Sequence, residues 1–154
     1  MKKGLFVILL LQMVLVTPLF ADQGLVSKSA NGSVAETADR LVAMLDANPA
    51  IRVVARVDHA ANAQSVNKHL PPTTLIIFGN PVLGSELMKE NQMAGIDLPM
   101  KILIWQDAKG KTQLTYNDPA WVAQRHGLTT SAPVIKKMSG ALNKITNKAA
   151  GTQE

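Results

Sequence analysis

The sequence contains no cysteine, and aromatic residues make up only 4% of its 154 positions. The lack of cysteine excludes disulfide bonds, metal sites with thiolate ligands, a thiol nucleophile and lipid-modified cysteine. Charged residues are sparse at 18%, but an apolar content of 47% argues against a disordered chain. Length and composition therefore predict one compact globular domain.

The N-terminus has the pattern of a secretory signal peptide over residues 1–21. Lys2 and Lys3 precede an apolar run from Leu5 to Val16, and Pro18 lies shortly before the small residue Ala21. The run is shorter than the ~20 residues that a membrane-spanning helix needs. We therefore expect cleavage after Ala21 and a periplasmic or secreted protein. An uncleaved N-terminal anchor is the alternative.

The formal net charge of +5 is unevenly distributed. Lys2 and Lys3 supply two of these charges, and basic and acidic residues balance between Asp22 and Leu128. The remaining excess lies after Leu128, where Lys136, Lys137, Lys144 and Lys148 stand against Glu154. A neutral body with a basic tail is not typical of a nucleic-acid-binding protein. We therefore expect no nucleic-acid partner.

Apolar periodicity predicts alternating strands and helices. The strands are expected at 24–28, 51–58, 74–79, 100–106 and 111–117, and the helices at 33–48, 59–70, 80–91, 118–127 and from 131 onward. This order predicts an α/β (α+β) domain over residues 22–128, with a mixed sheet that contains βαβ units and a β-hairpin. The short apolar run at 74–79 predicts a strand covered on both faces. We expect residues 129–154 to form a basic amphipathic helix and tail.

Several short runs occur in a fixed order along this domain. They are Arg56-Val57-Asp58-His59-Ala60, Phe78-Gly79-Asn80-Pro81, Asp97-Leu98-Pro99 with Ile102-Leu103-Ile104-Trp105, Tyr116-Asn117-Asp118-Pro119, and Arg125-His126-Gly127-Leu128. Together they resemble the bacterial domain-of-unknown-function family 302, from about Ser33 to Leu128. The resemblance implies a compact α/β domain, often exported and dimeric in related folds, with no agreed activity. The helix after Leu128 lies outside the usual pattern.

Asp58 and His59 are the best candidates for acid–base chemistry, because a carboxylate beside an imidazole can orient and polarise it. They lie where a strand ends and a helix begins. A purely structural role is the alternative, since an aspartate at that position also caps a helix.

A ligand cleft is expected where the strands end, with Arg56, Asn80 and Asp97 as binding residues beside Asp58 and His59. Each has a structural alternative. Asn80 precedes a proline and is typical of a helix cap, and Asp97 could bond loop amides before Leu98-Pro99.

No metal site and no cofactor are expected. The only histidines are His59, His69 and His126, and their spacing matches no metal-binding motif. The phosphate-loop pattern is also absent, so nothing supports nucleotide binding.

These observations favour a small-ligand-binding or protein-interaction module of the cell envelope, with a homodimer as one expected assembly. The alternative is a small enzyme that uses Asp58 and His59. A second alternative is a peripheral membrane protein held by the last helix, whose apolar stripe comprises Ile135, Met138, Leu142 and Ile145. That stripe has no Trp or Phe, so we expect protein rather than membrane to cover it.

Overall fold

The computed structural model describes residues 24–129 and 131–151. The predicted signal peptide and cleavage point lie outside the described residues. Within the described part of the chain, no helix has the length and apolar character needed to cross a membrane.

A five-stranded sheet forms the centre of the domain, in the order β1-β5-β4-β3-β2. The strands are β1 (Leu25–Ala30), β2 (Arg52–Asp58), β3 (Thr73–Gly79), β4 (Met100–Gln106) and β5 (Thr112–Asn117). All four neighbouring pairs are antiparallel. The prediction of an α/β single domain with a β-hairpin is confirmed, but the prediction of a mixed sheet is wrong.

The long connections explain this correction. β1 and β2 flank a helix and run in the same direction, as a βαβ unit requires, but they occupy opposite edges of the sheet. Three other strands lie between them, so the βαβ order produces no parallel pair. A hydrophobic pattern reports which residues are buried and not which strands become neighbours.

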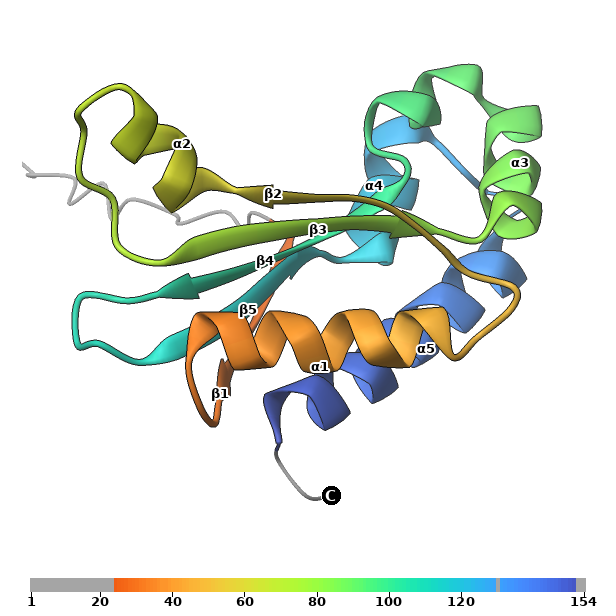
Figure 1. Ribbon diagram of the computed structural model, residues 1–154. Coiled ribbons are helices and arrows are strands. Elements are labelled where there is room, and N and C mark those ends of the chain that lie inside the picture. The colour runs from red at the N-terminus through yellow and green to blue at the C-terminus, as the bar shows by residue number, and fades with distance from the viewer. Residues whose placement is uncertain (1–23, 130, 152–154) are drawn as a thin grey trace, which may run out of the picture.

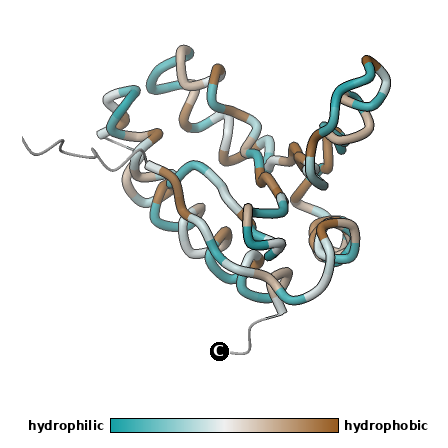
Figure 2. The backbone as a smooth tube through the Cα atoms, turned by 90° about the vertical axis from the view of Figure 1, so that its left-hand side faces the viewer, coloured by the Kyte–Doolittle hydropathy of each residue, from teal (hydrophilic) through white to brown (hydrophobic). Residues whose placement is uncertain are grey.

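Two long helices, α1 (Val34–Asp46) and α5 (Ala132–Ala150), cover one face of the sheet (Figure 1). The elements α3 (Pro81–Glu90), η1 (Gln92–Ile96) and α4 (Pro119–His126) gather near one end of the strands, and α2 (His59–Ser65) lies at the other end. Polar and apolar residues alternate along the tube in Figure 2, as amphipathic elements around one core require.

The core lies between the sheet and the helices α1 and α5. Alternate residues of β3 point into it: Thr74, Ile76 and Phe78 are buried, and the residues between them are half-buried. β3 is therefore buried on one face rather than on both, because the helices cover one face of an antiparallel sheet. A register shift between Val53 and Ala55 also places these two β2 residues opposite Phe78 and Ile77, on different faces, although simple alternation predicts the same face.

The last helix, α5, belongs to this core. Ile135, Met138 and Leu142 are buried and Ile145 is half-buried, so protein covers most of the apolar stripe, as predicted. At its start, the Glu90 carboxylate accepts hydrogen bonds from the backbone N–H and hydroxyl of Ser131. At its end, the backbone N–H of Asn31 donates to the carbonyl of Ala150. Both ends of α5 are thus fixed to other elements.

Local end signals account for the helix boundaries. Ser33 forms a capping box with Glu36 at the start of α1, and Asn80 and Asp118 cap α3 and α4. Only the second predicted helix is too long, because α2 ends at Ser65 rather than near residue 70. None of its residues is buried, so no packing extends it beyond its cap.

Candidate functional site

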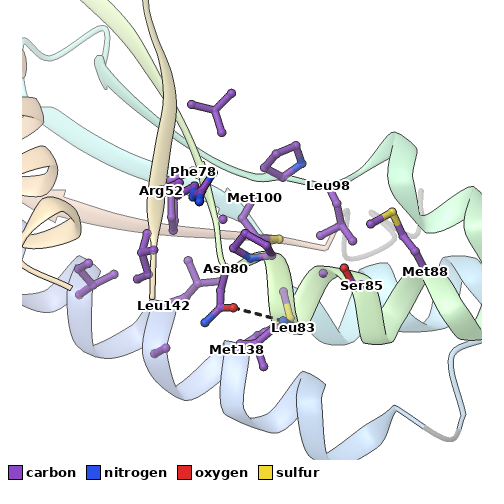
Figure 3. Close-up of a pocket in the computed structure, with 18 residues that line it drawn as sticks. Arg52, Phe78, Asn80, Leu83, Ser85, Met88, Leu98, Met100, Met138 and Leu142 are labelled. Carbon is purple, nitrogen blue, oxygen red and sulfur yellow. Dashed lines mark hydrogen bonds between the residues drawn. The ribbon is translucent and has the colours of Figure 1, made fainter. Parts of the chain in front are cut away.

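A cleft of about 370 Å³ opens between β2, the end of β3, the start of β4, and the helices α3 and α5 (Figure 3). Its walls are mostly aliphatic, aromatic and thioether side chains. The lining residues are Ile51, Arg52, Val54, Phe78, Gly79, Asn80, Pro81, Leu83, Gly84, Ser85, Met88, Leu98, Pro99, Met100, Met138, Ala141, Leu142 and Ile145.

The cleft exists because the chain leaves the sheet sharply at the end of β3. Asn80 stops the strand and starts α3, with its side-chain oxygen accepting hydrogen bonds from the N–H groups of Val82 and Leu83 at 2.9 and 3.3 Å. The preceding residue, Gly79, packs closely on the next loop, since a Cβ there would make a tight contact of 3.3 Å with the Cβ of Pro99. α3 therefore projects away from the sheet edge and leaves space above α5.

Polar groups are few in the cleft and differ in their availability. The carboxamide oxygen of Asn80 is engaged in capping α3, so it serves the fold first. Ser85 lies one turn further along α3, and Arg52 approaches from the first position of β2 (Figure 3). Arg52 is exposed and is the one ionisable residue among those that line the cleft.

The structure does not bring the predicted site residues together. Asn80 lines the cleft, but Asp58 pairs with Thr74 at the far end of β3, whereas Gly79 pairs with Arg52 at the near end. β3 has seven residues, so at ~3.3 Å per residue the two ends are about 20 Å apart. The prediction assumed that the C-terminal ends of β2 and β3 lie next to each other, as those of neighbouring parallel strands do.

Asp58 and Arg56 have structural partners. The Asp58 carboxylate caps α2 by accepting a hydrogen bond from the N–H of Ala61 at 2.9 Å. Arg56 forms an ion pair with Asp39 of α1 at 2.5 Å. His59 follows the cap as the first residue of α2 and is half-buried. The acid–base role of Asp58 and His59 stays a prediction, and the structural role of Asp58 is now visible.

Asp97 lies in a compact ionic cluster between η1 and α4. The Nε2 of His126 donates to its Oδ2 at 2.6 Å, and Arg125 reaches its Oδ1 at 3.2 Å. The side chains of Asp97 and His126 are only 10% and 7% exposed. The Arg125 guanidinium also lies over the ring of Trp121, 5.4 Å from its centroid. These contacts connect the end of η1 with the last turn of α4.

This cluster borders the cleft without lining it. Leu98 and Pro99, the next two residues after Asp97, contribute to the cleft wall. The pairing of Asp97 with His126 was not predicted, because nothing in the local pattern links two residues that lie 29 positions apart. The same holds for Met138 and Leu142, whose stripe indicates a buried face but not a cleft beside it.

Three described groups have clearly shifted pKa values, and none of them lines the cleft. Hydrogen bonds with Ser33 lower the pKa of Glu36, and a hydrogen bond from the N–H of Lys111 is the largest cause that lowers the pKa of Asp107. Burial raises the pKa of Tyr116. Among the described residues, no cluster of three or more His, Asp or Glu side chains could hold a metal ion.

Comparison with known proteins identifies relatives of the whole domain. Two proteins named "Fluoride-specific ion channel FluC 1", from Brucella suis biovar 1 (strain 1330) and Brucella abortus biovar 1 (strain 9-941), are each 47% identical over 131 residues, which is 84% of this chain. The match covers 51% and 48% of those proteins, so the chain spans about half the length of the curated relatives it matches.

A crystal structure of an uncharacterised conserved DUF302 protein from Bacillus stearothermophilus has the same fold. It superposes with a TM-score of 0.64 at 18% identity, over 84% of this chain and 97% of that one. The family model for the domain of unknown function DUF302 matches residues 26–145. The match includes most of α5, which was expected to lie outside the family pattern. With most of its length matched in this way, the chain belongs to the DUF302 family.

Proposed function

We propose that the chain is a small-molecule binding protein of the cell envelope and that the apolar cleft is its binding site. The observation that carries the proposal is the cleft itself, about 370 Å³ of space bounded mostly by apolar side chains. Ligand sites are typically concave, mostly apolar and about 300–1,000 Å³ in volume, with a few polar groups that orient the ligand. We therefore expect the ligand to be small and largely apolar.

The composition of the walls supports this proposal. Met88, Met100 and Met138 contribute three thioether side chains from three different elements. Methionine is unbranched and flexible, so it adapts to ligands of different shape without a change in the backbone. Phe78, buried at the end of β3, adds a rigid aromatic surface at the back of the cleft.

Small residues keep the space open. Gly84 and Ala141 both line the cleft, and apart from the neighbouring backbone of α3 nothing lies within 4 Å of the position that a Cβ at Gly84 would occupy. Gly84 is also a poor residue for the interior of α3. A larger apolar residue there would favour the helix and fill the space, so neither helix propensity nor packing calls for a glycine.

Fluorescence of N-phenyl-1-naphthylamine, a neutral apolar dye, tests the site directly. The wild-type protein should bind the dye with saturable enhancement, and Gly84→Leu, which projects a side chain into the cleft, should weaken binding at least about tenfold. Gly140→Leu is the matched control, because Gly140 is an exposed glycine of α5 that does not line the cleft. Equal dye binding by all three proteins would overturn the proposal.

The envelope location is supported by Lys2, Lys3 and the apolar run that follows them. Native mass spectrometry of protein purified from the periplasm would test both location and ligand, since a retained small molecule appears as added mass. The same measurement reports the oligomeric state, for which a homodimer stays a prediction.

A second candidate function is an accessory role beside a membrane ion channel. It is favoured by the two Brucella relatives, which carry the name of a fluoride-specific channel and match this chain over about half their length. Co-expression with the unmatched part of the Brucella suis protein tests it. Co-purification of the two parts, with altered fluoride resistance of the cells, is expected under this role, and failure of both would contradict it.

A further inference from the structure

We propose that the cleft selects an apolar molecule carrying one anionic group, such as a carboxylate, and that Arg52 binds this group. The inference rests on the proposed function and names the ligand class of the same site. It is carried by three observations: the position of Arg52, the partners of the other arginines and the lack of any other ionisable residue in the lining.

Arg52 is held at the rim of the cleft by the sheet. It is the first residue of β2 and lies opposite Gly79 of β3, and both residues line the cleft. Its side chain is turned toward the other lining residues in Figure 3. The backbone ladder thus fixes the base of the side chain, while its exposed end keeps contact with solvent. A charged group can therefore meet a ligand without being buried in the empty protein.

The other arginines of the described chain all have partners in the protein. Arg56 pairs with Asp39 and Arg125 with Asp97, and Arg40 donates to the carbonyls of Asn31 and Ala149. Among the four arginines of the sequence, all of which lie in the described residues, Arg52 alone makes no ion pair or side-chain hydrogen bond. Its guanidinium fork is free for a ligand.

The chemistry of this arrangement favours an anion over a neutral or cationic group. A guanidinium binds a carboxylate through two parallel, charge-assisted hydrogen bonds, and such bonds are stronger beside an apolar wall than in open water. A cation at the same place would be repelled. No carboxylate lines the cleft, so the protein supplies no competing partner for Arg52 and no attraction for a cationic ligand.

The volume limits the size of the apolar part. At ~30 Å³ for each water-sized group, the 370 Å³ cleft holds about a dozen such groups. This corresponds to a single medium-length chain rather than to a two-chain lipid. The ligand class is therefore a single-chain organic acid of roughly ten carbons, with its chain toward Met138 and Leu142 and its carboxylate at Arg52.

Displacement of the bound dye by three ligands of equal chain length tests the inference. Decanoate, decan-1-ol and decyltrimethylammonium differ at the head group and share the same apolar chain. Each is titrated at pH 7.4 against the wild-type protein, Arg52→Gln and the matched control Arg56→Gln. Arg56 lies on the same strand, and its loss changes the net charge equally, but it does not line the cleft.

Decanoate should displace the dye from the wild type at lower concentration than decanol, and decyltrimethylammonium should be the weakest. Arg52→Gln should lower the affinity for decanoate by about tenfold, as expected for loss of hydrogen bonds to a charged group. The affinity for decanol should stay within about twofold of the wild-type value. Arg56→Gln should change neither. High salt should lower the affinity for decanoate only in the proteins that retain Arg52.

Three results would overturn the inference while leaving the cleft as an apolar site. They are equal affinity for decanoate and decanol, equal weakening of both ligands by Arg52→Gln, and an equal effect of Arg56→Gln on decanoate. Failure of all three ligands and of the dye to bind the wild type would instead overturn the proposed function. The two failures are thus distinguished by decanol, which needs the cleft but not the arginine.

Discussion

Replacement of Gly84 by leucine should stabilise the protein while it closes the cleft. Gly84 lies inside α3, and the space around its missing side chain is open to the cleft. Leucine gains about 1 kcal/mol from helix propensity relative to glycine. Complete burial of a leucine side chain is worth about 1.5–3 kcal/mol, and an open cleft should provide roughly half of this. We therefore expect the free energy of unfolding to rise by about 2 kcal/mol.

Gly140→Leu separates the two contributions. Gly140 is an exposed residue of α5, and apart from the neighbouring backbone of the helix nothing lies within 4 Å of its Cβ position. Leucine there should gain only the helix-propensity contribution, about 1 kcal/mol. The comparison between the two variants therefore isolates the burial of one side chain in the cleft, about 1 kcal/mol.

Urea unfolding followed by far-ultraviolet circular dichroism measures both values, provided that the slope of the transition is the same in each protein. A Gly84→Leu protein no more stable than Gly140→Leu would show that the added side chain does not pack in the cleft. A destabilised Gly84→Leu protein with unchanged dye binding would contradict both the geometry and the proposed binding site.

Four further predictions concern positions outside the cleft. Asp58→Ala should lower the free energy of unfolding by about 0.5–2 kcal/mol, because the carboxylate caps α2. His59→Gln should lower the free energy of unfolding by less than ~1 kcal/mol. Global unfolding of that variant, seen by circular dichroism, would show that the histidine is structural. The pKa of Asp107 is lowered from 3.8 mainly by its hydrogen bond from Lys111, so its stabilising effect is complete above the unfolded-state pKa and is lost as pH falls through the lower folded-state pKa. The difference in stability between wild type and Asp107→Asn should therefore shrink from pH 7 to pH 2 in urea titrations, and a constant difference would refute the assignment. Finally, the intact mass of the exported protein should correspond to a start near Asp22, whereas a mass that includes Met1 would favour the uncleaved anchor.

The features that the sequence predicts well are those determined within a few residues. The helix starts expected at Asn80-Pro81 and near Asp118 are local features, and the structure confirms them. The capping box of Ser33 and Glu36 and the positive φ of Gly127 are equally local. The pairing of strands depends instead on contacts between distant segments. The β1–α1–β2 segment is read correctly as strand, helix, strand, yet its two strands lie at opposite edges of the sheet.

The wrong sheet topology also explains why the expected cleft was assembled from the wrong residues. In a parallel sheet, Asp58 and Asn80 would both follow the carboxyl ends of neighbouring strands and would lie close together. The antiparallel pairing of β2 with β3 instead brings the start of β2 to the end of β3. Arg52, at that start, thereby takes the place beside Asn80 that Asp58 was expected to occupy.

Arg52 and Arg56 illustrate why an arginine on a strand cannot be assigned a role from its spacing. Both lie on β2, four positions apart, and both are exposed. Which one is free depends on the acidic residues of other elements: Asp39 of α1 reaches Arg56, whereas no carboxylate lines the cleft at Arg52. An exposed ion pair of this kind contributes little to stability, about 0–1 kcal/mol. The difference between the two arginines is therefore one of availability to a ligand, and ligand selectivity rather than stability is the measurement that separates them.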